Sequence, residues 1–78
     1  NSAVTAYNLA NALREQGRFV EAIHRYRQCI QLDPASGRAH VNLAVLLATC
    51  PDPSLRDPSA ALVHAQEALK LLGEESHG

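Results

Sequence analysis

The sequence contains no tryptophan and no methionine, and its aromatic residues are limited to Tyr7, Phe19 and Tyr26. Alanine and leucine must therefore supply most of the buried surface, and both residue types favour helices. The core must also be thin, because a domain of about 60 residues removes only about 60% of its unfolded surface from water. With 78 residues, the chain is expected to form one small helical body.

An excess of one charge sign is also absent, since the chain has seven Lys and Arg residues and eight Asp and Glu residues. The chain therefore lacks the basic field that attracts nucleic acid or an anionic membrane surface. No apolar run approaches the roughly 20 residues that span a bilayer, and the polar residues of the first segment do not match a signal peptide. With only two cysteines, these features favour the cytoplasm. Because the chain does not begin with methionine, we expect a piece of a longer protein.

Apolar residues recur with the period of a helix and predict four helices. Gly17 and Pro34 are expected to end the first two, while Asp57 supplies a cap for the fourth. Gly73 is expected to end the fourth helix and leave residues 74–78 as a frayed tail. No segment shows the alternation of a strand. The predicted helices cover residues 3–16, 19–32, 36–49 and 58–72.

The second half of the chain repeats the first half. When Asn8 is aligned with Asn42, the Leu-Ala pair that follows each asparagine also coincides. The second helices align when Ala22 is placed on Ala61. These positions are 39 residues apart, whereas Asn8 and Asn42 are 34 apart, so the second copy carries five extra residues between its helices. The chain is therefore predicted to contain two helix–turn–helix units, residues 3–34 and 35–73.

The two copies carry a recurrent pattern of small and large residues. The first copy has Ala6-x2-Leu9-Ala10-x2-Leu13, Ala22-x3-Tyr26 and Pro34, and the second has His40-x2-Leu43-Ala44-x2-Leu47, Ala61-x3-Ala65 and Gly73. This pattern resembles the tetratricopeptide repeat family, whose units of about 34 residues read W-x2-L-G-x2-Y, A-x3-F and P. The resemblance covers residues 3–72. It implies an all-α fold in which two units form a short α–α superhelix, or α-solenoid.

The resemblance also implies a function. Members of the family line a concave groove with the first helix of each unit and hold there an extended peptide or a partner helix. The chain is therefore expected to be a protein–protein interaction module without a cofactor or a metal. The implied groove positions are Tyr7, Asn8, Asn11, Arg14, Glu15, Arg38, Val41, Asn42, Val45 and Thr49.

Asn8 and Asn42 are singled out because they occupy equivalent positions one unit apart. An asparagine amide carries donors and an acceptor, so it can pair with a peptide backbone of any sequence. The alternative interpretation is that these side chains bind a neighbouring helix or water. Asn11 with Asn42 also resembles two positions of the family's carboxylate clamp, although Tyr7 stands where that clamp has lysine.

The histidines do not match the spacing of a metal site. His40 takes the tryptophan position of the pattern and is expected in the core, while His24 and His64 are expected to face solvent. His77 lies in the predicted tail.

The cysteines suggest packing rather than catalysis. Cys29 falls at a small-residue position and is expected to be buried, and Cys50 is expected to pack at a helix end. A Cys29–Cys50 bridge stays open at this point. Neither cysteine has the histidine and acid that activate a nucleophile, so no enzyme activity is predicted.

The segment from Cys50 to Pro58 contains three prolines and is expected to be an ordered loop. One interpretation makes it a rigid connector, with Leu55 against the helices and Arg56 paired with an acid. The other makes it a second contact surface. Two further functions stay open: self-assembly into a homo-oligomer through exposed terminal helix faces, and substrate recognition for a larger enzyme.

Overall fold

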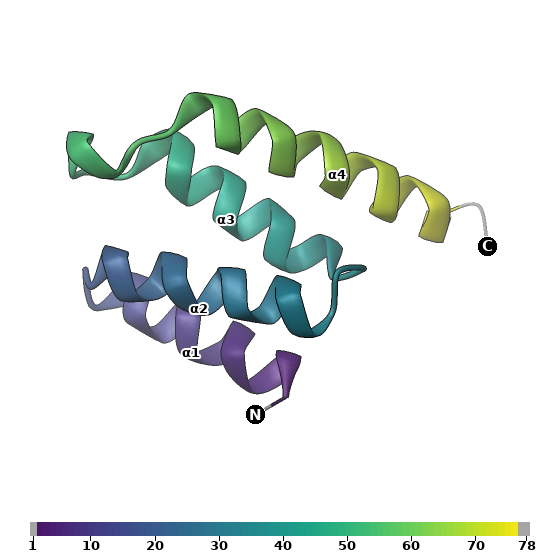
Figure 1. The fold of residues 1–78 in the computed structure, drawn as a ribbon, viewed down its shortest axis with the longest axis horizontal. Helices are drawn as coiled ribbons and strands as arrows, with labels where there is room; N and C mark the ends of the chain where they lie inside the picture. Colours follow the sequence, from purple (N-terminus) through teal and green to yellow (C-terminus); the bar gives the residue numbers. More distant parts are fainter. Residues whose placement is uncertain (1, 77–78) are drawn as a thin grey trace.

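The computed structural model describes residues 2–76 and consists of four α-helices and one short 3-10 helix (Figure 1). No strand occurs in this part of the chain, so the all-α prediction is confirmed. The first three helices begin and end within one residue of the predicted positions. The elements are α1 (Ala3–Glu15), α2 (Phe19–Leu32), α3 (Gly37–Thr49), η1 (Pro53–Leu55) and α4 (Pro58–Ser76).

The end of α4 differs from the prediction. The helix continues through Gly73 to Ser76, whereas the predicted helix ended at residue 72. A glycine ends a helix when it takes the left-handed conformation, and among the described residues only Gly17 does so, with φ 78°. There the N–H of Arg18 donates to the Leu13 carbonyl oxygen at 2.9 Å and closes α1. The first three residues of the predicted tail, 74–76, are part of α4, and the rest of that tail lies outside the described residues.

Side chains next to the helix starts satisfy the first free N–H groups. Ser2 accepts a hydrogen bond from the Thr5 N–H at 3.1 Å, and Ser36 accepts one from the Ala39 N–H at 3.3 Å. Asp57 caps α4 in the predicted way, since its Oδ1 accepts from the Ala60 N–H at 3.0 Å. Local sequence thus determines where three of the helices begin.

The helices form two pairs, α1 with α2 and α3 with α4, and α3 lies between α2 and α4 (Figure 1). The core centres on Tyr26, Leu43 and Leu47, which are all fully buried. Ala10 and Ala22 are completely inaccessible and allow the helices to approach closely. Small side chains at helix contacts therefore replace the aromatic bulk that the sequence lacks.

The connection between α3 and α4 is held in place by specific contacts. Leu55 packs against the core as predicted. Arg56 was expected to pair with an acid, but its hydrogen bond goes to the backbone: its Nε donates to the Cys50 carbonyl oxygen at 2.7 Å. This carbonyl follows the last turn of α3, where backbone acceptors have no partner within the helix. The Asp57 N–H also donates to the Leu47 carbonyl oxygen at 2.9 Å.

His40 is buried and His24 is exposed, as predicted. His64 was expected in solvent but is half-buried, because its ring lies against that of His40. Both cysteines are buried and free, so the bridge between Cys29 and Cys50 does not form.

Two classes of feature are not found in residues 2–76. No group of three or more His, Cys, Asp or Glu residues is placed to hold a metal ion among the side chains that the structure describes. No helix in the same range has both the length and the apolar character needed to cross a membrane.

Candidate functional site

Four polar side chains from three helices meet between α1 and α3. Tyr7 and Asn11 lie four residues apart and therefore share one face of α1, while Tyr26 comes from α2 and Asn42 from α3. The Tyr26 hydroxyl donates to Asn11 Oδ1. Asn42 Nδ2 donates to Asn11 Oδ1 at 3.0 Å and to the Tyr7 hydroxyl at 3.1 Å. These four residues are called the polar network below.

The protonation of Tyr26 suits its role as a donor. Burial raises the pKa of the Tyr26 phenol above its ordinary value of 10.0, while the nearby Arg14 acts in the opposite direction. The hydroxyl therefore keeps its proton near neutral pH and donates a hydrogen bond to Asn11 Oδ1. The ring of Tyr26 also meets that of Tyr7 edge-on, with centroids 6.2 Å apart, which fixes both hydroxyls.

The hydrogen bonds leave one defined polar group on each amide. Asn42 uses both N–H groups inside the network, so its Oδ1 is left as an acceptor. Asn11 uses its oxygen twice, so its Nδ2 is left as a donor. Every fully buried side-chain nitrogen or oxygen among the described residues has a hydrogen-bond partner. Because Asn42 Oδ1 and Asn11 Nδ2 have none in this part of the chain, neither atom is fully buried. The network presents an acceptor and a donor from adjacent helices.

A small hollow of about 220 Å³ adjoins the network at Tyr7. It brings together Tyr7, Asn8 and Arg38, three residues of the predicted groove that come from both copies. Asn8 and Arg38 are exposed there. The lining residues are Ala3, Val4, Tyr7, Asn8, Cys29, Asp33, Ser36 and Arg38.

Two other predicted groove residues, Val45 and Thr49, border a different hollow of about 360 Å³ between α3 and α4. Its lining is mostly alanine and is called the α3–α4 face below. When the two copies are aligned, the α3–α4 face of the second copy corresponds to a surface of α1 and α2 in the first copy. In the first copy, α3 packs on that surface. The lining residues are Ala44, Val45, Ala48, Thr49, Ala61, Leu62 and Ala65.

The remaining predicted residues lie outside these two hollows. Glu15 is exposed near the end of α1, and Arg14 and Val41 are half-buried. Asn8 and Asn42 differ although their sequence positions are equivalent, because Asn42 bonds to α1 and Asn8 faces outward.

Sequence reasoning assigned Tyr26 to the core and missed its hydroxyl. A signal was present, because the family pattern has phenylalanine at this position. A tyrosine that is buried in the same place needs a hydrogen-bond partner for its hydroxyl.

Comparison with known proteins identifies the repeat. A family model described as TPR repeat matches residues 10–49, which is just over half of the chain. The match includes Asn11, Tyr26 and Asn42 of the polar network. No curated protein and no solved structure matched the chain at a significant level. The match and the two packed helix pairs show that the chain belongs to the tetratricopeptide repeat family.

Proposed function

We propose that the surface between α1 and α3 binds an extended peptide segment of a partner protein. Repeats of this family mediate protein–protein interactions and are typically non-catalytic. The observation that carries the proposal is the pair of groups that the polar network leaves open, Asn42 Oδ1 and Asn11 Nδ2. A peptide backbone offers a matching N–H and C=O in every residue, whatever its side chain.

The network also prepares the surface for binding. Both amides are held by hydrogen bonds to Tyr7 or Tyr26, so their orientation does not have to be fixed by the ligand. Binding therefore costs less conformational entropy than it would on a surface of free side chains. This ordering favours recognition of a backbone by Asn11 and Asn42.

The adjoining hollow is suited to a side chain of the same peptide. Val4 and Tyr7 supply apolar surface, and Arg38 supplies an exposed positive charge. Asn8 lies at this hollow and offers a second amide one unit away from Asn42. The other predicted positions, Arg14, Glu15, Val41, Val45 and Thr49, extend the proposed path along α1 and α3.

A peptide selected from a random phage-displayed library on the 78-residue chain, and then titrated by calorimetry, tests the proposal. Asn8→Ala and Asn42→Ala are each expected to weaken binding by about tenfold, since each removes a hydrogen-bonding group. Lys70→Ala, on the exposed side of α4, is the matched control and should bind as the wild type does. Circular dichroism confirms that each variant is helical.

The outcome that contradicts the proposal is equally specific. If the selected peptide binds both asparagine variants as tightly as the wild type, neither amide contacts the peptide. If Lys70→Ala weakens binding as much as Asn8→Ala does, the peptide lies elsewhere on the chain. Asn8 is exposed, so its substitution tests contact with the peptide without disturbing the polar network.

The α3–α4 face favours self-association as a second candidate function. Val45 and Leu62 are 52% and 59% exposed on this face, and Leu69 further along α4 is 75% exposed. The equivalent surface of α1 and α2 already holds a helix, α3. Contact between copies of the chain would remove this apolar surface from water.

Sedimentation velocity over a range of concentrations tests self-association. The expected result is a concentration-dependent larger species that Leu62→Glu removes and Asn8→Ala leaves unchanged. A monomer at every concentration contradicts this second function. A monomer at every concentration would not bear on peptide binding between α1 and α3, which the peptide titrations test separately.

A further inference from the structure

The connection between α3 and α4 forms a third hollow together with residues 20–27 of α2. The start of α2 and this connection lie at the same end of the molecule (Figure 1). The hollow has a volume of about 410 Å³, which falls within the range of about 300 to 1,000 Å³ found for ligand sites. It is called the edge hollow below and is lined by Val20, Ile23, His24, Arg27, Leu47, Ser54, Leu55, Arg56 and Asp57.

The inner part of the edge hollow is apolar. Ile23 and Leu47 belong to the core and form its floor. Val20 is 65% exposed, and Leu55 is half-buried on the connection. An apolar side chain placed among Val20, Ile23 and Leu55 would therefore be removed from water on several sides.

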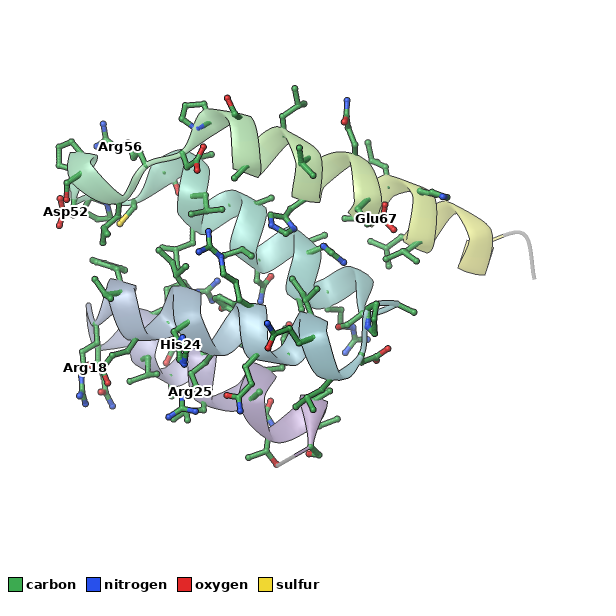
Figure 2. All side chains as sticks on the ribbon, in the orientation of Figure 1. Arg18, His24, Arg25, Asp52, Arg56 and Glu67 are labelled. Carbon is green, nitrogen blue, oxygen red and sulfur yellow. The ribbon has the colours of Figure 1, made fainter. Side chains whose placement is uncertain are left out.

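Two arginines and a histidine border this apolar part. Arg27 and His24 come from α2 and Arg56 from the connection; Figure 2 shows His24 and Arg56 on these two elements. All three side chains are exposed. One carboxylate, that of Asp57, also lines the hollow, and its Oδ1 accepts the capping hydrogen bond from Ala60.

Neither arginine of the hollow forms an ion pair among the described side chains, where an ion pair joins Arg18 to Glu21 at 2.8 Å. The charge of Arg56 acts on the nearby carboxylate of Asp52, which is exposed on the same connection. The Nε of Arg56 donates to the Cys50 carbonyl oxygen. This bond orients the guanidinium and leaves its terminal nitrogens available to a ligand. Arg27 is exposed on α2. The edge hollow thus combines an apolar floor with two permanent positive charges that form no ion pair with a carboxylate among the described side chains.

We propose that the edge hollow binds an acidic peptide segment of a partner protein through one apolar side chain and a flanking carboxylate. The apolar side chain would contact Val20, Ile23 and Leu55. The carboxylate would pair with Arg27 or Arg56, because the planar guanidinium donates hydrogen bonds to both carboxylate oxygens at once. This site is separate from the surface between α1 and α3 and shares no lining residue with the hollow at Tyr7.

The edge hollow depends on the five residues by which the second copy exceeds the first. In the first copy, α1 and α2 are joined by residues 16–18 alone, too short to form a comparable wall. In the second copy, η1 places Ser54 and Leu55 opposite α2. The binding surface is therefore particular to this connection rather than common to both units.

The test uses three short synthetic peptides and the isotope-labelled 78-residue chain. One peptide alternates leucine with glutamate, the second replaces leucine by serine, and the third replaces glutamate by lysine. In nuclear magnetic resonance titrations, the leucine–glutamate peptide is expected to shift the resonances of Val20, Ile23 and Leu55. The other two peptides are expected to bind at least about tenfold more weakly, since each lacks one half of the recognition.

Matched variants assign the charges. Arg27→Gln and Arg56→Gln are each expected to weaken binding by about tenfold, and added salt should weaken wild-type binding. Arg25→Gln removes the same charge from the same helix at a residue that does not line the hollow, and it should bind as the wild type does. Arg27 is exposed, so its variant is expected to keep its fold even if the loss of Arg56 loosens the connection.

Three results would overturn the proposal. The first is no saturable shift at peptide concentrations up to about 1 mM, the weak end of specific binding. The second is equal weakening by Arg25→Gln and Arg27→Gln, which would indicate a general charge effect. The third is a set of shifts at Asn8 and Asn42 instead of Val20 and Leu55, which would place the peptide between α1 and α3.

Discussion

The Nδ1 atoms of His40 and His64 lie 3.0 Å apart, so a hydrogen bond between two imidazoles joins α3 to α4. His40 Nε2 is 3.2 Å from the Pro34 carbonyl oxygen. A carbonyl oxygen only accepts, so this nitrogen carries a hydrogen, and the Nδ1 of neutral His40 is then an acceptor. His64 must therefore donate from its Nδ1, which fixes the tautomers of both rings.

This pair predicts a loss of stability in mild acid. Burial lowers the pKa of His64 below its ordinary value of 6.5, and the neighbouring His40 and Arg27 act in the same direction. The unfolded chain therefore takes up a proton on His64 at a higher pH than the folded chain. The stabilising contribution is complete above about pH 6.5 and decreases as the pH falls towards the lower pKa of the folded state.

Thermal unfolding at about pH 7.5 and about pH 5 measures this effect, because histidine changes its charge within that range. His64→Gln is expected to show a smaller decrease in melting temperature between the two conditions than the wild type shows. Equal decreases in the two proteins would mean that His64 does not contribute to the pH dependence.

The polar network predicts different effects at the two equivalent asparagines. Asn42→Ala removes two hydrogen bonds to α1 and is expected to lower the free energy of unfolding by about 1–3 kcal/mol. Asn8→Ala replaces an exposed side chain and should change it by less than about 0.5 kcal/mol. Urea unfolding followed by circular dichroism gives both values, and similar losses would contradict the assignment of Asn42 to the network.

Gly17 and Gly73 are expected to respond in opposite directions to alanine. Gly17 has φ 78° and open space around its missing Cβ, so Gly17→Ala should cost about 1–2 kcal/mol through backbone strain alone. Gly73 also has open space, but it lies inside α4, where alanine should stabilise the helix by up to about 1 kcal/mol. Urea unfolding measures both changes, and destabilisation by Gly73→Ala would mean that α4 ends at this glycine.

The buried cysteines predict slow chemical modification. Burial raises the pKa of the Cys29 thiol, so little of it is the reactive thiolate, and Cys50 is fully buried. Both thiols should react with a disulfide reagent at a rate limited by opening of the folded chain, and rapidly in denaturant. The Cys29→Ala and Cys50→Ala variants report each thiol separately, and rapid labelling of either one in the native chain would contradict its burial.

The sequence predicted the helices and the family because both depend on local spacing. The contacts of Ala10, Ala22 and Leu43 follow from the same periodicity, since the small and large residues recur on one face of each helix. The partners of polar side chains do not follow from spacing. His64 was placed in solvent because nothing in its own segment indicates that His40 lies beside it.

The details of the site were hidden for the same reason. Asn8 and Asn42 look alike in the sequence, and only the position of α1 against α3 separates their roles. Arg56 found a carbonyl oxygen instead of an acid because the end of α3 lies within its reach. These contacts depend on how elements meet in space, and a repeat pattern carries that information only for its apolar positions.

The place of the inserted connection has a consequence for engineering. The extra residues lie between α3 and α4, inside the second unit, so the interval from Asn8 to Asn42 is unaffected. A change in the length of the connection is therefore expected to leave the register of α1 against α3 unchanged. The edge hollow and the surface between α1 and α3 are expected to allow redesign of one while the other is kept.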